Sequence, residues 1–343
     1  MHVLIVDAGH ALDVDVERAI LGPGITVEAI ATRDPAAVEA SAWARADAVL
    51  SWLMPIGAAE IPQLSRCRVL VKYGVGYDIF DIAAAGRAGI AVCNVPDYGT
   101  GEVADHAMAM MLSLRRGLPS FARLLADDPV GGWNWSAGPL MKRLATDRLG
   151  IVGIGRIGTA VARRALGFGM QVAWFDPHVG AGGDRPGMRV DSLDELLATS
   201  DIVTLHCPLT DETRGLIGAR ALSQIKPGAI LVNTARGAVA DLGAVHDALR
   251  SGRLGGAGID VFPDEPPDPG SPLLAAFRDQ PVWAAGRIML SPHAAFYSPQ
   301  SWRDMREKAA ATARDMLLRG EARNCVNVRF LPGSGLRGGG KTV

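Results

Sequence analysis

A glycine-rich segment at residues 149–176, LGIVGIGRIGTAVARRALGFGMQVAWFD, constrains the fold of this chain more than any other feature. Gly153, Gly155 and Gly158 form a G-x-G-x-x-G pattern, which follows an apolar run typical of a buried strand and precedes a helical stretch. A second apolar run ends the segment at Asp176. Strand, glycine turn, helix and strand in this order predict a parallel β-α-β unit.

Each glycine has its own physical role in binding a dinucleotide. Gly153 lets the chain turn tightly out of the strand, Gly155 lets a pyrophosphate approach the backbone, and Gly158 permits close packing of helix on strand. The phosphates are expected at the positive end of the helix dipole. A carboxylate at Asp176 accepts hydrogen bonds from the ribose hydroxyls and repels a 2′-phosphate, so NAD is predicted rather than NADP. The alternative is a glycine-rich turn that binds no ligand.

Similar apolar runs alternate with helical stretches on both sides of this unit, which predicts an α/β fold. The further strands are expected at residues 2–7, 25–30, 47–50, 68–71, 90–93, 201–205, 229–233, 257–260 and 287–291. Helices are expected between most of them, among others at 35–45, 78–88, 101–126 and 299–319. The segment 127–147, which bears Trp133 and Trp135, is interpreted as a surface connection. Its tryptophans either line an apolar pocket or cover surface.

Composition excludes several classes of protein. The 343 residues are enough for two domains of about 150 residues each. With 35 Lys and Arg against 36 Asp and Glu, the net charge of −1 argues against a nucleic-acid or anionic-membrane binder. The start, MHVLIVDAGH, reads as a first strand, and no apolar run approaches the roughly 20 residues of a membrane span. A cytoplasmic protein is therefore expected.

The four cysteines, Cys67, Cys93, Cys207 and Cys325, are widely separated in the sequence. They form no C-x-x-C pair and no Cys/His spacing of the kind that binds zinc. Reduced thiols in the core are expected, with no disulfide framework and no metal site.

Three later segments complete a recognisable order of motifs. They are residues 232–237 (VNTARG), residues 258–262 (GIDVF) followed by Glu265-Pro266, and residues 291–295 (SPHAA). Together with the glycine motif they resemble the D-isomer-specific 2-hydroxyacid dehydrogenase family, over about residues 45 to 328. Within the family, SPHAAFYS and GIAVCNVP are most similar to the branch of the C-terminal binding proteins, which includes transcriptional corepressors.

The resemblance implies two Rossmann-like, doubly wound domains. A flavodoxin-like substrate-binding domain would take residues 1–98 and 295–332, and an NAD-binding domain, residues 99–294, would be inserted into it. The active site would lie in the cleft between them. The glycine-rich tail 333–343 is expected to be disordered. The resemblance also implies a homodimer built largely through the nucleotide domains.

Reduction of a 2-oxo acid needs a cation for the carboxylate and ketone, a proton donor and a fixed hydride donor. Arg236 fits the first role because its guanidinium makes forked hydrogen bonds. His293 matches the acid/base of the family, and imidazole titrates near neutral pH. Glu265 fits the partner that orients this ring and stabilises its charged form. The alternatives are a surface arginine, a structural histidine and a solvated loop acid.

The resemblance also assigns residues to the cofactor and to the substrate. NAD, as NADH, would contact Gly153, Gly155, Arg156, Ile157, Gly158, Asp176, His206, Cys207, Pro208, Thr213, Thr234, Ala235, Asp260 and Val103. Asp260 would accept a hydrogen bond from the nicotinamide carboxamide, and His206 would be a wall of the cofactor site. The substrate would contact Lys72, Tyr73, Gly74, Val75, Gly76 and Phe296. Glycines in this loop expose backbone N–H groups that bind anions.

Two classes of function compete. The first is an NAD-dependent enzyme that interconverts a 2-oxo acid and its (R)-2-hydroxy acid. The second is an NAD(H)-sensing scaffold like the corepressors. Because corepressors carry a long C-terminal extension and this sequence ends soon after its last expected helix, the enzyme is the favoured expectation. Oxidation of an unusual small acid such as phosphite is a further alternative.

Overall fold

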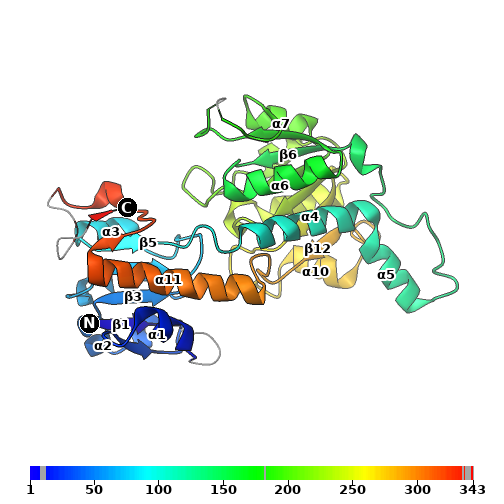
Figure 1. The fold of residues 1–343 in the computed structure, drawn as a ribbon. Helices are drawn as coiled ribbons and strands as arrows, with labels where there is room; N and C mark the ends of the chain where they lie inside the picture. Colours follow the sequence, from blue (N-terminus) through cyan, green and yellow to red (C-terminus); the bar gives the residue numbers. More distant parts are fainter. Residues whose placement is uncertain (8–12, 181–182, 334–335, 337–340, 343) are drawn as a thin grey trace. The chain divides into compact units, whose positions relative to one another are not determined.

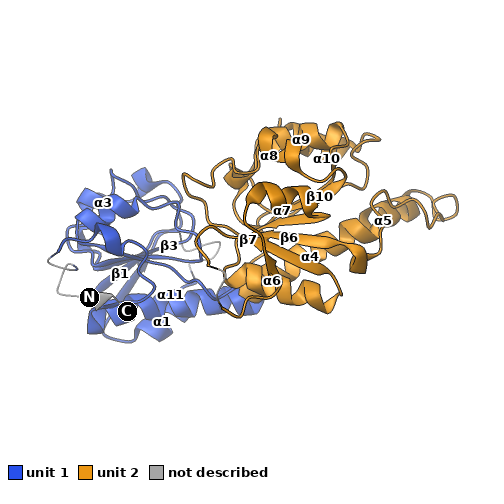
Figure 2. Cartoon of the chain, turned by 90° about the horizontal axis from the view of Figure 1, so that it is seen from above, with its two compact units in different colours: residues 1–99, 298–343 blue, residues 100–297 orange. Residues whose placement is uncertain are grey.

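The computed structural model describes residues 1–343 except 8–12, 181–182, 334–335, 337–340 and 343. The chain forms two compact units, which Figure 2 shows in separate colours. Unit 1 comprises residues 1–99 and 298–343, and unit 2 comprises residues 100–297, so unit 2 is an insertion in unit 1. The boundaries expected from the sequence are 98/99 and 294/295. Within the described residues, no helix is both long and apolar enough to cross a bilayer.

Unit 1 is built on a parallel sheet whose strand order is β2-β1-β3-β4-β5. The strands are β1 His2–Ile5, β2 Thr26–Ala29, β3 Ala48–Ser51, β4 Val69–Lys72 and β5 Ala91–Cys93. The helices are α1 Asp15–Leu21, α2 Ala40–Arg45, α3 Ile82–Arg87 and α11 Pro299–Arg319. This is the flavodoxin-like order of doubly wound folds.

Alternate residues of each strand in unit 1 face opposite sides of the sheet, as the pleat requires. Val3 and Ile5 belong to a core cluster that includes Met305 of α11. Leu4 belongs to the cluster on the other face, which includes Trp43 of α2. Continuous apolar strands are thus explained by a sheet with both faces buried.

Unit 2 has a parallel sheet of order β12-β11-β10-β9-β6-β7-β8. Its strands are β6 Arg148–Val152, β7 Gln171–Phe175, β8 Met188–Arg189, β9 Ile202–Leu205, β10 Ala229–Asn233, β11 Leu254–Ile259 and β12 Ile288–Leu290. Its helices are α4 Thr100–Arg116, α5 Leu118–Asp127, α6 Arg156–Gly167, α7 Leu193–Thr199, α8 Ala219–Gln224, α9 Leu242–Arg250 and α10 Pro272–Asp279. The order reverses between β6 and β9, the switch point at which doubly wound sheets bind dinucleotides. The α/β prediction with two parallel, doubly wound sheets is confirmed.

The predicted single helix at 101–126 is wrong, because the structure divides it into α4 and α5 (Figure 1). Gly117 lies between them with φ 67°, a left-handed conformation that ends a helix. A side chain could not replace this glycine, because a Cβ would lie 2.9 Å from the Cα of Gly138. The break turns α5 away from the sheet of unit 2.

The predicted disordered tail, 333–343, falls largely outside the described residues. Of the residues that are described, Leu336 is buried in the core of unit 1. The strand β14 Lys341–Thr342 pairs with β13 Glu321–Ala322.

Candidate active site

The glycine turn joins β6 to α6 at the switch point of the unit 2 sheet. Gly153 has φ 90°, and a Cβ there would lie 2.8 Å from the Cys207 nitrogen. At Gly158 a Cβ would lie 2.1 Å from the Gly153 oxygen, so helix and strand touch at this point. A Cβ at Gly155 would meet nothing within 4 Å. The backbone is therefore open where a pyrophosphate would approach, at the first turn of α6, and the site fits a dinucleotide.

Asp176 ends β7 beside the glycine turn. Its carboxylate accepts hydrogen bonds from the nitrogens of Ile154, at 3.1 Å, and His178, at 3.0 Å. Arg185 also reaches this turn, since its Nη1 donates to the Ile154 oxygen at 2.8 Å and to Thr159 Oγ1 at 3.2 Å. Sequence reasoning missed Arg185 because no motif connects it to the turn.

The segment after β9 contributes groups that are neutral at neutral pH. Burial lowers the pKa of His206 to about 3, and its Nε2 pairs with Thr204 Oγ1 at 2.9 Å. Burial raises the pKa of Cys207 to about 11. Thr213 shapes the loop that follows, because its hydroxyl donates to the Pro208 oxygen at 2.6 Å. None of these groups is suited to proton transfer.

Of the remaining cofactor candidates, Arg156 and Ile157 form the first turn of α6, and Val103 is buried in α4. Thr234 is buried after β10, and its hydroxyl has no hydrogen-bond partner among the residues that the structure describes. A buried hydroxyl without a partner loses free energy unless a ligand satisfies it. Thr234 therefore fits the role of a cofactor contact.

Arg236 follows β10 in a turn braced by Asn233. The Asn233 side chain accepts from the Ala235 nitrogen at 3.0 Å and donates to the Arg236 oxygen at 2.9 Å. Gly237 packs against the backbone of Phe262, which a Cβ would overlap at 1.9 Å. The turn that carries Arg236 thus lies against the loop that carries Glu265. Sequence reasoning did not single out Asn233, although it lies within the NTARG motif.

Glu265 and His293 form a hydrogen-bonded pair, in which His293 Nδ1 lies 2.6 Å from Glu265 Oε2. The other carboxylate oxygen accepts from the Phe262 nitrogen at 3.0 Å, which fixes the carboxylate in place. Since Nδ1 is occupied by Glu265, Nε2 is the ring nitrogen left for another partner. Phe296 packs edge-on against the ring, with centroids 6.0 Å apart.

The charge state of Glu265 follows from its neighbours. Burial opposes its ionisation, but the hydrogen bond and charge of His293 and the charge of Arg236 outweigh burial. The pKa of Glu265 is therefore lowered below its ordinary value of 4.5. The structure thus brings Arg236 within electrostatic reach of the pair, and the carboxylate is ionised at neutral pH.

Asp260 holds the turn that presents His293. Its carboxylate accepts from the nitrogens of Ala294, at 2.9 Å, and Ala295, at 3.1 Å, and from the Ser291 hydroxyl. The backbone nitrogen of His293 donates to the backbone carbonyl oxygen of Asp260 at 2.7 Å, and His293 takes an unusual φ of 52°. Asp260 is therefore a positioning residue in this structure, in addition to its expected contact with nicotinamide.

His106 of α4 extends this network. Its Nε2 lies 2.9 Å from Ser291 Oγ and 3.7 Å from Asp260 Oδ1. Sequence reasoning missed His106, because helical periodicity does not show which residue of α4 meets the turn after β12. It did not single out Ser291, although this residue lies within the SPHAA motif. Within the described residues, no group of three His, Cys, Asp or Glu side chains is arranged to hold a metal.

The expected substrate loop lies in unit 1, after β4. Asn94 donates to the Val75 oxygen at 2.6 Å, and the Val95 nitrogen donates to the Gly74 oxygen at 3.0 Å, so the segment after β5 holds this loop. Val75 is exposed, as an anion-binding loop requires. Gly76 is the next residue of the loop and is half-buried.

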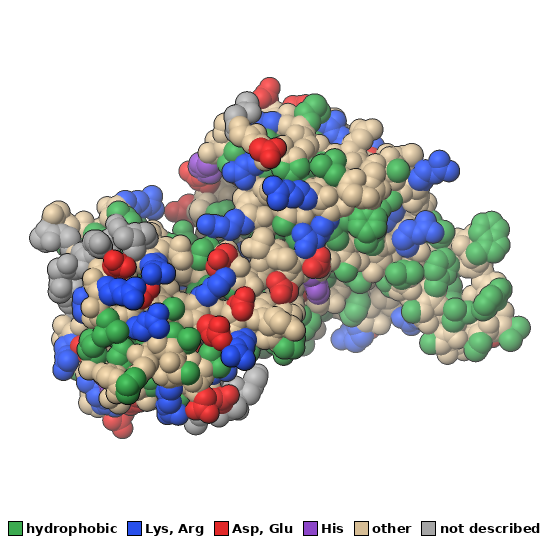
Figure 3. Space-filling model, in the orientation of Figure 1, with side chains coloured by type: hydrophobic (Ala, Val, Ile, Leu, Met, Phe, Trp, Pro, Cys, Tyr) green, Lys and Arg blue, Asp and Glu red, His purple; other side chains and the backbone are tan. Residues whose placement is uncertain are grey.

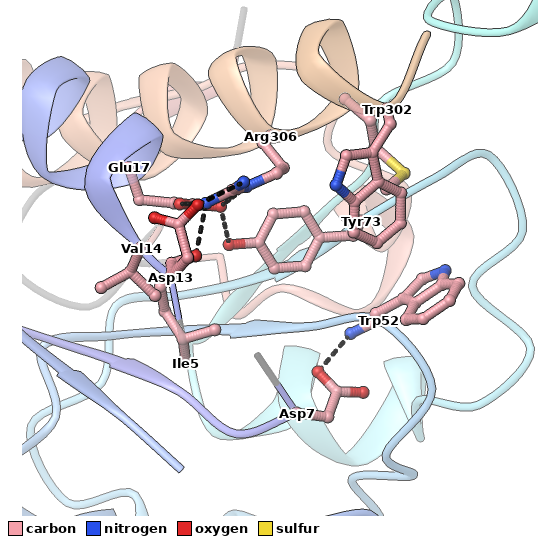
Figure 4. A pocket seen from close by; sticks show the side chains of 10 residues that line it. Ile5, Asp7, Asp13, Val14, Glu17, Trp52, Tyr73, Trp302 and Arg306 are labelled. Carbon is pink, nitrogen blue, oxygen red and sulfur yellow. Dashed lines mark hydrogen bonds and ion pairs between the residues drawn. The ribbon is translucent and has the colours of Figure 1, made fainter. Parts of the chain in front are cut away.

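The loop's two larger side chains are turned into unit 1. Lys72 is buried and donates to the Tyr73 oxygen at 2.7 Å. The Tyr73 hydroxyl donates to Glu17, which also pairs with Arg306 (Figure 4). A cavity of about 20 Å³ lies beside Tyr73, Glu17 and Arg306. Asp7, Trp52 and Trp302 also line it. It has room for about one water molecule, so it is too small for a substrate.

Comparison with known proteins relates the chain to one family. The family model for the NAD binding domain of D-isomer specific 2-hydroxyacid dehydrogenases matches residues 108–295. Glyoxylate reductase from Korarchaeum cryptofilum is 39% identical over 270 residues, which are 77% of each chain.

Solved structures are similar along almost the whole chain. An NADPH-dependent glyoxylate/hydroxypyruvate reductase from Sinorhizobium meliloti, solved with NADP and malonate, has a TM-score of 0.82 at 28% identity, covering 95% of this chain and 96% of the other. D-Lactate dehydrogenase from Aquifex aeolicus, solved with NAD and lactic acid, has a TM-score of 0.79 at 27% identity, covering 92% and 95%. The two relatives bind different cofactors.

Proposed function

Because the chain belongs to the D-isomer specific 2-hydroxyacid dehydrogenase family, whose members reduce 2-oxo acids, we propose that it uses NADH to make the (R)-2-hydroxy acid. The observation that carries this proposal is the 2.6 Å pair of His293 and Glu265 beside Arg236. Charged His293 donates the proton from Nε2 to the developing alkoxide, and Glu265 stabilises the charge on the ring. Arg236 binds the carboxylate and polarises the ketone.

We further propose that the backbone of residues 74–76 binds the substrate carboxylate and that Phe296 borders the substrate. Bound NADH would supply the hydride. Gly153, Gly155 and Gly158 would hold its phosphates at the first turn of α6. His206, Thr234 and Asp260 would border the cofactor without exchanging protons with the substrate.

The test is NADH consumption with glyoxylate, hydroxypyruvate, pyruvate, phenylpyruvate and branched 2-oxo acids. Turnover of at least one of these acids, with the (R) product wherever the product is chiral, is the expected result. A lack of turnover with all of them would contradict the proposal. A corepressor-like scaffold would bind NADH without turnover.

The relatives reported above are reductases and dehydrogenases, and they give no support to the narrower resemblance to C-terminal binding proteins.

We expect the protein to prefer NADH over NADPH because of the Asp176 carboxylate. In Asp176→Ala, loss of the ribose hydrogen bonds should weaken NADH binding by about thirtyfold, from about 1 kcal/mol for each of two bonds. Loss of the negative charge should at the same time improve binding of NADPH, because the repulsion between Asp176 and the 2′-phosphate is removed. The measurement is KM for both cofactors. Equal weakening of the two would mean that Asp176 acts only through its bonds to Ile154 and His178.

Glu265→Gln should lower kcat/KM at neutral pH by at least about tenfold, because the amide cannot balance the charge on His293. In the wild type, protonation of Glu265 removes this partner. Because the pKa of Glu265 is lowered, the contribution of the Glu265–His293 pair to kcat/KM is present above pH 4.5. It is lost only as the pH falls through the lower pKa that Glu265 has in the folded protein. An acid limb of kcat/KM below 4.5 is therefore expected in the wild type.

The Glu265→Gln profile should lack this limb, whereas Glu265→Asp and the neighbouring Asp264→Asn should retain it. The measurement is kcat/KM from neutral to acid pH. A wild-type profile in Glu265→Gln would remove residue 265 from the mechanism.

A homodimer is proposed from the arm formed by α5 and residues 128–141. No residue of α5 is buried, and Val130, Trp133 and Trp135 are 86%, 80% and 84% exposed. Hydrophobic side chains gather at this end of unit 2, where the arm extends away from the sheet (Figure 3). Both tryptophans therefore lie on the surface of their own chain. Burial of large apolar groups of this kind is typical of a permanent interface.

Changing both Trp133 and Trp135 to serine should convert a dimer to a monomer in sedimentation velocity, with unchanged circular dichroism. Val282, which is 96% exposed elsewhere on unit 2, provides the matched control as Val282→Ser. A wild-type protein that sediments as a monomer would refute the proposed dimer.

A further inference from the structure

Cys93 and Cys325 lie side by side in unit 1, although 232 positions separate them in the sequence (325 − 93). Cys93 ends β5, and Cys325 follows α11 and the short strand β13. The two residues form an antiparallel β-bridge, and the Val326 nitrogen donates to the Val92 oxygen at 2.8 Å. Sequence reasoning expected separate thiols, since nothing local connects these segments.

The register of this bridge suits a disulfide. The hydrogen bond joins the residues that flank the cysteines, so Cys93 and Cys325 are a non-hydrogen-bonded pair, a type in which the Cα atoms are generally about 4.5 Å apart. This separation is within the range of about 4.4 to 6.8 Å that disulfides span. The two thiols lie within reach of each other, because their interaction shifts the pKa of both, and the Cys325 thiol also donates to Asn327 Oδ1 at 3.2 Å.

The two thiols are chemically unequal. The hydrogen bond from Cys93 lowers the pKa of Cys325 to about 7, whereas the same bond and burial raise the pKa of Cys93 well above its ordinary value. Cys325 is half-buried and Cys93 is fully buried. Cys325 is therefore the sulfur that an oxidant meets first, as a thiolate, and Cys93 is placed to react second.

We propose that Cys93 and Cys325 are a reversible dithiol/disulfide site, oxidised by hydroperoxides, that acts on the neighbouring substrate loop. The Cys325 sulfur attacks one oxygen of hydrogen peroxide; an S–O bond forms, the O–O bond breaks, and the released hydroxide takes up a proton as water. The Cys93 sulfur then attacks Cys325; the S–S bond forms, the S–O bond breaks, and a second water leaves with the Cys93 proton. Two thiols lose two electrons and one peroxide becomes two waters.

The link to the substrate loop is direct. Asn94 and Val95, the two residues after Cys93, hold the carbonyls of Val75 and Gly74. A disulfide brings the sulfurs to about 2 Å from each other, nearer than a thiol hydrogen bond does. Although the backbone separation already suits a disulfide, we expect this contraction to displace the end of β5 slightly, and the displacement would pass to the loop through these two bonds. This second part of the proposal rests on the proposed function, because it concerns the affinity for a 2-oxo acid.

The experiment treats the full-length protein with hydrogen peroxide and counts thiols after denaturation. The count should fall from four to two, return to four with dithiothreitol, and be accompanied by a peptide cross-linked between Cys93 and Cys325. Cys93→Ser should give no cross-link and should leave a sulfenic acid at Cys325 that dimedone traps. Cys67→Ser and Cys207→Ser are the matched controls, and both should still form the cross-link. An unchanged thiol count, or a cross-link between other cysteines, would overturn the site.

The oxidised protein should show a rise of about two- to tenfold in KM for the 2-oxo acid, the value of one weakened hydrogen bond. The KM for NADH should stay the same, and Cys93→Ser should not respond to peroxide in this way. An unchanged KM for the 2-oxo acid in the cross-linked protein would overturn the coupling to the loop. Thiol counting needs no turnover, so an inactive protein would contradict the proposed function and would still decide whether the disulfide forms.

Discussion

His293→Ala is expected to lower kcat for 2-oxo acid reduction by about 10²- to 10⁴-fold, the usual contribution of a positioned general acid. No other group described at the site replaces it. His206 is held neutral by burial, with a pKa of about 3, and is therefore no substitute donor. The affinity for NADH should be nearly unchanged, because the glycine turn that binds its phosphates lies at β6 and α6.

The measurement combines steady-state kinetics with a fluorescence titration of NADH. His246→Gln, on α9, is the matched control and should behave as wild type. His293→Asn tests geometry separately, because it keeps a polar side chain in the turn held by Asp260 but cannot donate a proton as an acid. Turnover that survives in His293→Ala would show that another group supplies the proton.

Arg236→Ala is expected to lower kcat/KM by about 10²- to 10³-fold, comparable to removal of one charge-stabilising donor in other enzymes. Two functions are lost together, because the guanidinium binds the carboxylate and stabilises charge on the ketone oxygen. Arg236→Lys restores the charge but not the fork of donors, so it should remain at least about tenfold below wild type.

The activity of Arg236→Lys and the melting temperature of Arg236→Ala distinguish this role from a structural one. If Arg236 only supported the fold, Arg236→Lys would recover full activity and Arg236→Ala would lower the melting temperature. Arg250→Ala, on the exposed end of α9, is the control for loss of one arginine. Kinetics of Arg236→Ala that match this control would exclude Arg236 from the site.

Much of the fold could be predicted because its signals are local. An apolar strand, a glycine turn and a helix lie next to one another in the chain, so β6, α6 and β7 follow from about 30 residues of sequence. The helix break at Gly117 had a local signal, because Arg115 and Arg116 precede this glycine and Pro119 follows it, but the apolar periodicity continues across the break and hides it. The approach of Gly138 adds a non-local reason why no side chain fits at residue 117.

Candidate site residues were identified from motifs, but their contacts were not. The motifs suggested Glu265 as the partner of His293, and the folded chain places them 2.6 Å apart. The bracing of the His293 turn by Asp260, with Ser291 and His106, had no sequence signal. Three separate segments meet there, and periodicity describes only one segment at a time.

The amino-acid sequence alone determined the α/β class, the nucleotide-binding unit and the residue types available for hydride and proton chemistry, because neighbouring residues encode each of these. Only the tertiary structure decided which distant groups meet: Arg185 beside the glycine turn, Asp260 under the His293 turn, and Cys93 against Cys325. Such contacts arise when strands far apart in the chain are paired in one sheet and their ends are brought to the same edge. No pattern within a single segment carries that information.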